Sequence, residues 1–471
     1  MRRIRETCIC FLVAVLFLCT VAPTAEALTQ NDPAVSSGCH SIDAARPLEN
    51  QTQVLETAKA AFVYERVSGT VIYAWNADSK VYPASMVKLM TALIALEEGD
   101  LADRVVVTQS ALNQLTPGAL TMHLVAGEEL TLEQLLYGMM VASANDAAVV
   151  IAEHIAGSQA GFLARMNEKA RELGCTGTSF SNTHGLHDEM TFTTARDVCR
   201  LVLAGLENEM FRTLFETTSY PLPATNKSEE RKLNSTNYMM FDSSKAYYDQ
   251  RVTGGRTGST DAAGRCIAVT ASDNGMELVC VIMGAQPTYS EDGSKVERFG
   301  SFEEMKDLLN YTYDGYTFHQ LATQGQVLTQ IPVENGANDV AINPEHSISA
   351  VLPVELNETA LVWHYDFGAL SAPVEAGQTL GSLQIWYGQI CLGETALEAA
   401  NSATVDTTLV MPFRPSEMDD RGSWITVVII VGIAVFALAV TMIVRWTPRL
   451  IRKVQLRLRR KRRRIYRRRT R

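Results

Sequence analysis

The sequence has few cysteines, and no two of them have the spacing of a zinc site. Nine cysteines occur in 471 residues, and three of these lie within the first 27 positions. No Cys-x-x-Cys pair is present, so a structural zinc site has no support. The other six cysteines are too sparse for a disulfide framework, although an even number permits individual bridges. Cys266 and Cys280 flank a predicted hairpin and could approach each other, but cross-strand geometry is restrictive.

Charged residues are absent from 424–444, and acidic residues are absent from 445–471. An uncharged stretch of 21 residues has the length of a membrane-spanning helix. The 15 lysines and arginines that follow it resist translocation and stay cytoplasmic. The sequence therefore predicts a transmembrane helix over 424–444, a cytoplasmic tail over 445–471 and an extracytoplasmic chain before them.

The N-terminus has the pattern of a secretory signal peptide. Arginines at positions 2, 3 and 5 precede an apolar stretch, and Ala25-Glu26-Ala27 is a small-x-small cleavage signal. We expect residues 1–27 to be removed. The alternative is an uncleaved anchor helix, for which the apolar stretch is short.

The net charge of −10 conceals an asymmetry between the tail and the rest of the chain. Without the 15 positive charges of the tail and the net +1 of residues 1–27, the charge becomes −26. A strongly acidic chain argues against nucleic acid as its partner. The basic tail could bind nucleic acid or anionic lipid, but a stop-transfer segment on the inner leaflet is the simpler interpretation.

Hydrophobic periodicity predicts an α+β fold. Residues 60–74 read as a hairpin with a Ser68-Gly69 turn, and residues 265–271 and 276–285 read as a second hairpin around an Asp-Asn-Gly turn. Helices are predicted at 84–98, 301–311, within 130–155 and after Thr194. We expect the first hairpin and the last strands to form one antiparallel sheet flanked by helices. Short β-branched runs after residue 318 predict a separate small β domain.

Three short motifs follow one another in a meaningful order. Ser85-Met86-Val87-Lys88 is S-x-x-K, Ser143-Ala144-Asn145 is S-x-N, and Arg256-Thr257-Gly258 occupies the place of K-T-G. Residues i and i+3 share a helix face, so Lys88 can reach the Ser85 hydroxyl and act as its base. Each motif alone has a plain structural explanation, such as a helix cap at Ser143 or Asn145. Their order and context together indicate a serine nucleophile.

The chain resembles the low-molecular-weight penicillin-binding proteins, the serine D-alanyl-D-alanine carboxypeptidases of the S11 type. The resemblance rests on NADSKVYPASMVKLMTALIALE, SFSNTHGL followed by TTARD, NSTNYM, RTGSTDAAG and SAPVEAGQTLGSLQI, and it spans residues 58–408. It implies a β-lactamase/transpeptidase-like domain and a small all-β C-terminal domain. It also implies peptidoglycan stem peptides as substrate, β-lactam antibiotics as inhibitors and no cofactor.

The resemblance also implies roles for the motif residues. Ser85 would be acylated, Lys88 would be the general base, and Ser143 would complete the catalytic set. Substrate-binding residues would be Asn145, Arg256, Thr257, Gly258 and Ser259, with the backbone N–H groups of Ser85 and Ser259 forming the oxyanion hole. Arg256 departs from the usual lysine and cannot give up its proton. His184 and His187 form H-x-x-H, which we expect to be a loop beside the site and not a metal site.

These observations predict seven segments and leave two other functions open. The segments are a signal peptide (1–27), a lead-in (28–57), a serine carboxypeptidase domain (58–315), a β-rich domain (316–408), a linker (409–423), a transmembrane helix (424–444) and a tail (445–471). The expected location is the bacterial cell membrane, crossed once. A β-lactamase would share the acylation chemistry, and a catalytically silent penicillin-binding sensor would explain Arg256.

Overall fold

A computed structural model describes residues 42, 47–48, 51–292, 296–356, 358–407, 428–438 and 440–441. The predicted signal peptide, linker and basic tail lie outside the described residues. By its contacts the chain divides into two units. The first comprises residues 1–329, 341–369 and 377–400, and the second comprises residues 330–340, 370–376 and 401–471.

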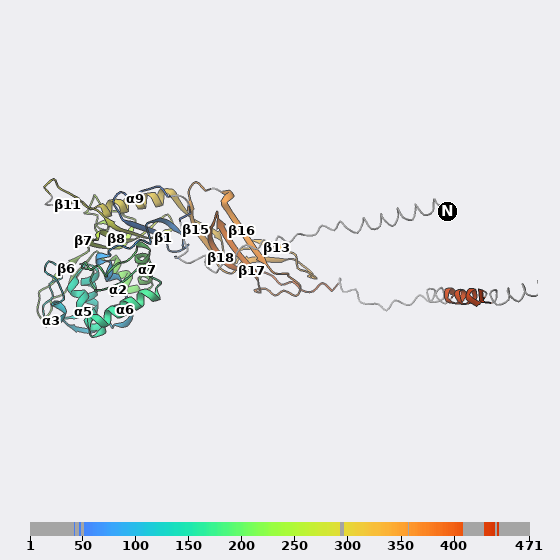
Figure 1. The fold of residues 1–471 in the computed structure, drawn as a ribbon, viewed down its shortest axis with the longest axis horizontal. Helices are drawn as coiled ribbons and strands as arrows, with labels where there is room; N and C mark the ends of the chain where they lie inside the picture. The colour runs from blue at the N-terminus through green and yellow to red at the C-terminus, as the bar shows by residue number, and fades with distance from the viewer. Residues whose placement is uncertain are drawn as a thin grey trace, which may run out of the picture. The chain divides into compact units, whose positions relative to one another are not determined.

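A five-stranded antiparallel sheet is the centre of the first unit (Figure 1). Its order is β2-β1-β9-β8-β7, with β2 (Val71–Trp75), β1 (Ala60–Glu65), β9 (Met276–Ala285), β8 (Gly264–Asp273) and β7 (Val252–Thr260). The N-terminal hairpin thus pairs with β9, which comes some 200 residues later in the chain. This confirms the predicted sheet. It also makes β7, the strand that carries the third motif, an edge strand.

Both predicted hairpins turn where the sequence indicated. Gly69 has a φ of 72°, and Asn274 and Gly275 have φ values of 50° and 77°. Consecutive positive φ angles are those of a two-residue turn whose twist matches the strands it joins, and Asn-Gly is the residue pair that adopts them most easily. The β8–β9 register is fixed by this turn.

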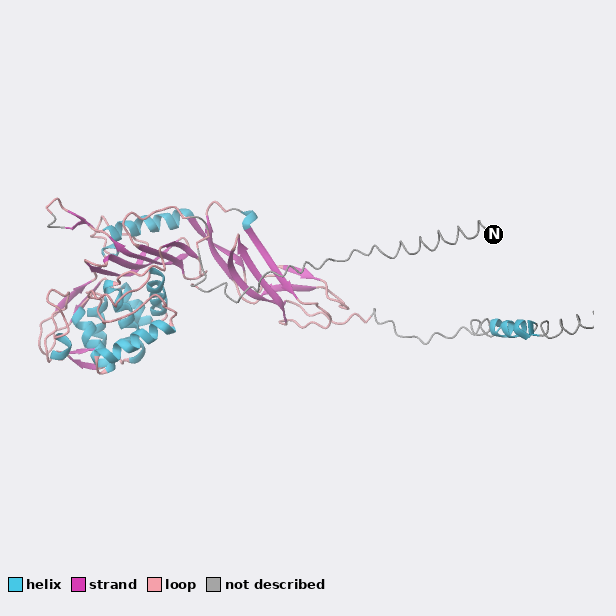
Figure 2. Cartoon of the chain, in the orientation of Figure 1, coloured by secondary structure: helices cyan, strands magenta, loops and turns pink. Residues whose placement is uncertain are grey.

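Helices cover one face of the sheet (Figure 2). They are α2 (Val87–Glu98), α3 (Gln109–Leu112), α4 (Leu132–Met140), α5 (Asn145–Ala156), α6 (Gln159–Glu172), α7 (Ala195–Leu206) and α8 (Glu209–Glu216). Side-chain oxygens cap five of them at the N-terminus, from Thr108, Thr131, Ser158, Thr194 and Asn208. In α2 every residue from Val87 to Ala95 is buried, which is the pattern of a central helix surrounded by others.

The opposite face of the sheet packs against α9 (Gly300–Gly315). Phe302, Met305, Leu308 and Leu309 of α9 are buried there with alternate residues of the strands. Shorter elements connect the layers: η1 (Ala84–Met86), β3 (Arg104–Val106), β4 (Glu129–Thr131), β5 (Ser219–Leu222), β6 (Arg231–Asn234), η2 (Tyr238–Met240), β10 (Thr288–Tyr289) and β11 (Val296–Arg298).

The predicted β-rich region follows α9 directly. Its strands are β12 (Tyr316–Ala322), β13 (Thr329–Ile331), β14 (Val340–Pro344), β15 (Ile348–Pro353), β16 (Leu361–Phe367), β17 (Thr379–Tyr387) and β18 (Ile390–Ala399), with η3 (Glu358–Ala360) between β15 and β16. β12 pairs with β15, and β14, β18, β17 and β16 are neighbours in a second sheet. In the second unit, isolated bridges join Glu334 to Ser371 and Val374 to Ala403.

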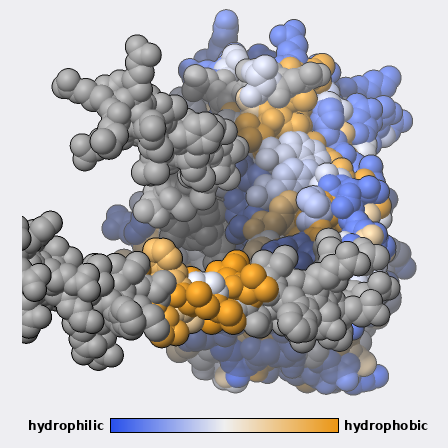
Figure 3. All heavy atoms as spheres, turned by 90° about the vertical axis from the view of Figure 1, so that its right-hand side faces the viewer, coloured by the Kyte–Doolittle hydropathy of each residue, from blue (hydrophilic) through white to orange (hydrophobic). Residues whose placement is uncertain are grey.

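The part of the predicted transmembrane segment that is described forms a short apolar helix, Val428–Leu438. Its side chains are exposed, as the hydrophobic band in Figure 3 shows, and Phe436 is 72% exposed. Within the described residues, no single helix combines the length and the apolar composition of a membrane span. α5 and α6 satisfy both conditions only together, with a bend of 89° between them.

The two hairpin cysteines do not form a disulfide. Cys266 and Cys280 are free thiols, as are Cys175 and Cys199, while Cys391 is disulfide-bonded. Cys266 belongs to the hydrophobic cluster on the helical face of the sheet, and Cys280 belongs to the cluster under α9. Side chains on opposite faces of a sheet cannot be bridged. Burial raises the pKa of the Cys266 thiol to about 11, so it stays protonated.

Candidate active site

Ser85 lies in the 3₁₀ turn η1, immediately before α2. Pro83 precedes this turn, and Ala84 takes a positive φ of 48°. The carbonyl of Ala84 packs against Gly185, whose own φ is 86°. A methyl group added at Gly185 would lie 1.9 Å from the Ala84 oxygen, so only glycine fits there. The loop around Gly185 therefore fixes the backbone that presents Ser85.

Lys88 lies one turn further on and is completely buried. Its Nζ is 3.0 Å from Ser85 Oγ, 2.7 Å from Asn145 Oδ1 and 2.5 Å from the carbonyl oxygen of His184. A neutral amine has two N–H donors and one lone pair. Asn145 Oδ1 and the His184 carbonyl oxygen accept hydrogen bonds from the two N–H groups of Lys88. The lone pair of the Lys88 amine is then directed at the Ser85 hydroxyl.

Burial is the main cause that lowers the pKa of Lys88 well below its ordinary value. The positive charge of Arg256 lowers it further, and Asp146 acts in the opposite direction. Burial also raises the pKa of Asp146, although the backbone N–H groups of Leu124 and Met122 oppose this by donating to its carboxylate. Lys88 has no carboxylate among its hydrogen-bond partners in the described structure, which favours the neutral amine.

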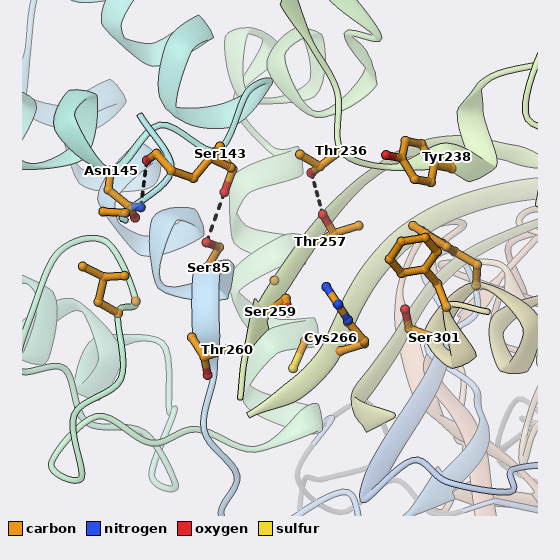
Figure 4. A pocket seen from close by; sticks show the side chains of 18 of the residues that line it. Ser85, Ser143, Asn145, Thr236, Tyr238, Thr257, Ser259, Thr260, Cys266 and Ser301 are labelled. Carbon is orange, nitrogen blue, oxygen red and sulfur yellow. Dashed lines mark hydrogen bonds between the residues drawn. The ribbon is translucent and has the colours of Figure 1, made fainter. Parts of the chain in front are cut away.

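The second motif places Ser143 and Asn145 at the junction of α4 and α5. Ser143 has a φ of 61°, and its hydroxyl donates to Ser85 Oγ at 3.1 Å. Asn145 Nδ2 donates to the carbonyl of Leu120 at 2.8 Å, which leaves its Oδ1 for Lys88 (Figure 4). The N-cap of α5 is Ala144, and no side chain caps it. The helix-cap explanation of this motif is therefore wrong.

Arg256 lies behind Ser143 and not in the pocket that Ser85 opens into. Only 2% of its surface is exposed, and it is absent from the described residues that line that pocket. Its guanidinium donates to the Met140 carbonyl at 2.5 Å and to Ser143 Oγ at 2.9 Å. Burial lowers the pKa of Arg256 to about 9, which still leaves it charged at neutral pH. Arg256 therefore contacts the α4–α5 turn, and its role in substrate binding stays a prediction.

The remaining residues of the third motif do face the pocket. Thr257, Gly258 and Ser259 line a cavity of about 380 Å³ together with Ser85, Ser143 and Asn145. A methyl group on Gly258 would lie 2.8 Å from the Ser85 nitrogen, so β7 passes directly beside the start of η1. The Thr257 hydroxyl is hydrogen-bonded to that of Thr236 (Figure 4).

Three groups that belong to the site were not identified from the sequence. They are the His184 carbonyl that holds Lys88, the Thr236 hydroxyl, and Asp146 behind Asn145. The segments SFSNTHGL and NSTNYM contain the first two, but a backbone carbonyl leaves no signal in a residue pattern. His187 packs edge-on against Tyr82, with ring centroids 4.6 Å apart. Burial and the nearby Lys88 lower the pKa of His184 to about 4, so its ring is neutral.

Comparison with known proteins agrees with this geometry. The D-alanyl-D-alanine carboxypeptidase model of peptidase family S11 matches residues 48–287, and that of the penicillin-binding protein 5 C-terminal domain matches residues 316–404. The chain belongs to the S11 family of D-alanyl-D-alanine carboxypeptidases. It is a serine hydrolase with the α+β domain and the β-rich C-terminal domain of that family.

Relatives from several bacteria share most of the chain. D-alanyl-D-alanine carboxypeptidase DacF of Bacillus subtilis is 30% identical over 356 residues, covering 74% of this chain and 86% of the relative. DacC of Escherichia coli is 28% identical, with 69% and 79% covered. The crystal structure of penicillin-binding protein 5 from Haemophilus influenzae superposes with a TM-score of 0.60 and 25% identity, covering 76% of this chain and 99% of that one.

The contact between Gly185 and Ala84 yields a paired test. We expect Gly185→Ala to abolish acylation of Ser85, because the new methyl group must displace the backbone before the nucleophile. Gly174→Ala is the matched control, since Gly174 has a φ of 70° but open space around it. It should cost only about 1 kcal/mol of stability from backbone strain. Thermal melting and labelling with fluorescent penicillin measure the two effects. Equal behaviour of the variants would contradict this role of Gly185.

Proposed function

We propose that this chain is a serine D-alanyl-D-alanine carboxypeptidase that removes the terminal D-alanine of peptidoglycan stem peptides through an acyl-enzyme on Ser85. The observation that carries the proposal is the 3.0 Å contact between Ser85 Oγ and the Nζ of the fully buried Lys88. A serine hydroxyl is a weak nucleophile and needs an adjacent base. Lys88 is such a base because burial and Arg256 favour its neutral form.

Acylation begins when Lys88 takes the proton of Ser85 and the alkoxide attacks the carbonyl of the penultimate D-alanine. The substrate lies along the free edge of β7, as an added strand does. The backbone N–H groups of Ser85 and Ser259 then bind the oxyanion. Their closeness is supported by the contact of Gly258 with the Ser85 nitrogen.

The leaving amine of D-alanine receives its proton from the Ser143 hydroxyl beside Ser85, and the proton that Lys88 took from Ser85 then passes to Ser143 Oγ. The 3.1 Å hydrogen bond between the two serines supports this route. Arg256 donates to Ser143 Oγ, so the hydroxyl hydrogen of Ser143 points away from the guanidinium and towards the reacting atoms. Lys88 is neutral again at the end of acylation. It can then activate the water that releases the shortened peptide.

The pocket itself argues against a β-lactamase. Fast deacylation of a penicillin adduct in class A enzymes uses a glutamate and a water. Among the described residues that line the pocket there is no carboxylate. We therefore propose that penicillin acylates Ser85 and remains bound as an inhibitor. A silent sensor is disfavoured because the base, the nucleophile and the proton donor are all in hydrogen-bonding distance.

We further propose that the catalytic domain lies outside the cytoplasmic membrane, anchored by residues 424–444. The support is the uncharged 21-residue stretch, the adjoining basic tail and the exposed apolar side chains of Val428–Leu438. This topology would bring the site to the peptidoglycan.

Removal of the nucleophile tests the acyl-enzyme directly. Ser85→Ala should lose both the covalent penicillin adduct and the release of D-alanine from a peptide ending in D-Ala-D-Ala. The measurements are mass spectrometry of the adduct and a D-alanine assay on purified residues 28–423. Ser68→Ala, in the β1–β2 turn, is the control and should keep both activities. An adduct that persists in Ser85→Ala would refute the assignment. Adduct formation without D-alanine release by the unchanged protein would support the sensor.

The charge at position 256 should set the pH dependence. Removing a nearby cation raises the pKa of Lys88, so Arg256→Gln should move the acid limb of kcat/KM to higher pH. Arg256→Lys keeps the charge and should leave the limb in place, with activity retained or raised. The readout is the pH profile of penicillin acylation for the three proteins. An unshifted limb in Arg256→Gln, or total loss of activity in Arg256→Lys, would contradict the electrostatic role.

Accessibility in intact cells tests the membrane topology. A cysteine-reactive reagent that does not cross membranes should label a cysteine placed at Ser290, in the catalytic domain, and leave one placed at Thr470 unlabelled. Deleting residues 424–471 should release the protein from the membrane fraction. If the cysteine at position 470 is labelled from outside, the proposed orientation is wrong.

A further inference from the structure

β16 leaves one edge of the second β-sheet open. It is the last strand in the order β13-β14-β18-β17-β16, so β17 is the only described strand that it pairs with (Figure 1). The two strands pair over the whole of β16, from Leu361 opposite Tyr387 to Phe367 opposite Gly381. No hydrogen bond in the described part of the chain joins the other side of β16 to a further segment. Such an edge presents unpaired N–H and C=O groups along its length.

The amino-acid sequence of β16 favours the addition of a strand. It reads Leu-Val-Trp-His-Tyr-Asp-Phe, and its β-branched and aromatic residues are the types that favour strands. No residue of β16 is buried, and Val362 and Tyr365 are 41% and 40% exposed. Proteins usually block a free edge with lysine, proline or a bulge. β16 contains neither lysine nor proline, and its pairing with β17 shows no shift of register.

The aromatic side chains of β16 form a row on one face of the sheet. Trp363, Tyr365 and Phe367 alternate along the strand, so they project on the same side. The ring centroids of Trp363 and Tyr365 are 6.4 Å apart, and those of Tyr365 and Phe367 are 5.8 Å apart. Both pairs of rings are close to parallel, with interplanar angles of 24° and 14°. The three rings therefore support one another within a single copy of the chain.

The opposite face of β16 carries one basic and one acidic side chain. His364 and Asp366 are two residues apart, so they project on the same side, and both are exposed. The His364 ring packs edge-on against Trp386, with centroids 6.4 Å apart. Neither side chain forms an ion pair with another residue in the ranges that the structure describes. An antiparallel partner with the same sequence would bring each of them opposite the other.

A second copy of β16 matches both faces in a single register. In an antiparallel pair with its two-fold axis at Tyr365, residue 364 of one copy lies opposite residue 366 of the other. His364 then meets Asp366 at two places. Trp363 meets Phe367 in the same way, and the two Tyr365 side chains meet at the axis. Opposite charges and aromatic pairs are the cross-strand combinations that stabilise antiparallel strands. An axis one residue earlier would bring the two His364 side chains together and lose both pairings of opposite charge.

We propose that the edge of β16 binds a second copy of this chain and forms a symmetric dimer through a continuous antiparallel sheet. The two-fold axis is perpendicular to the sheet, so the aromatic rows of the two copies lie on the same face. The charge complementarity of His364 and Asp366 favours a second copy over an unrelated peptide. This interface does not depend on the proposed activity.

Reversing one charge at a time tests the partner and the register together. In His364→Glu two carboxylates face each other across the interface, and in Asp366→Lys a lysine faces the histidine. Each variant should therefore dimerise about tenfold more weakly than the unchanged protein. When the two variants are mixed, they should form a heterodimer, because the new glutamate faces the new lysine and the remaining histidine faces the remaining aspartate. Sedimentation velocity of the full-length chain in detergent measures both effects.

Cross-linking in isolated membranes provides a second test. Residues opposite each other on antiparallel strands have Cα atoms about 4.5–5.5 Å apart, which is within the range of a disulfide. Mild oxidation of Tyr365→Cys should therefore join two copies into a species of twice the mass on a non-reducing gel. Tyr289→Cys, at a tyrosine of β10 that is 51% exposed, is the matched control and should stay unlinked. The free cysteines of the described structure are buried, so they should not react.

Tyr365→Lys is the variant that should separate the two copies. It places like charges at the axis and should give a monomer, whereas Tyr289→Lys should dimerise as the unchanged protein does. Circular dichroism checks that both variants remain folded. The β16 interface is wrong if the unchanged protein is monomeric, or if Tyr365→Lys still dimerises. It is equally wrong if the two charge variants do not associate when mixed, or if position 365 cross-links no better than position 289.

Discussion

The site depends on keeping a lysine uncharged inside the protein. Removing an ammonium group from water is costly, and the usual remedy is a carboxylate partner that would restore the charge. Here the amine of Lys88 is surrounded by an amide oxygen, a backbone carbonyl and a hydroxyl, none of which carries a formal charge. Of its two charged neighbours, Arg256 has the same sign as the ammonium form and affects the pKa more than Asp146, which opposes it. Every contact around Lys88 is therefore consistent with a base ready to take a proton.

This arrangement requires a rigid frame, because three separate segments must meet at one nitrogen atom. α2 is buried continuously from Val87 to Ala95 and carries Lys88 at its start. Two non-glycine residues of the site, Ala84 and Ser143, adopt positive φ angles that are unfavourable in isolation. These conformations are maintained because the Ala84 carbonyl packs against Gly185 and the Ser143 hydroxyl accepts a hydrogen bond from Arg256. Packing energy from the core thus maintains a catalytic geometry that the local sequence would not choose.

Helical spacing and turn residues in the sequence predicted the helices and strands well. They could not predict on which face of the sheet a given side chain lies. The S-x-x-K spacing predicted the Ser85–Lys88 contact because helical periodicity fixes it, and the Asp-Asn-Gly turn predicted the β8–β9 hairpin. Two arginines near the third motif could not be distinguished from sequence. Arg256 and Arg265 lie on opposite faces of the sheet, and that difference depends on the register between β7 and β8. The cysteine pair was undecidable for the same reason, since Cys266 and Cys280 fall on different faces.

The strand that we propose binds the substrate lies at the edge of a sheet, a position that also exposes the protein to unwanted self-association. An edge strand with free N–H and C=O groups can recruit strands from other molecules and start aggregates. β7 reads Val-Thr-Gly-Gly-Arg-Thr-Gly-Ser-Thr, with three glycines, a charge and a single large aliphatic residue. Such a strand has weak intrinsic β propensity and offers little apolar surface for a steric zipper. The composition that lets a peptide approach Ser85 closely therefore also protects the open edge from pairing with copies of itself.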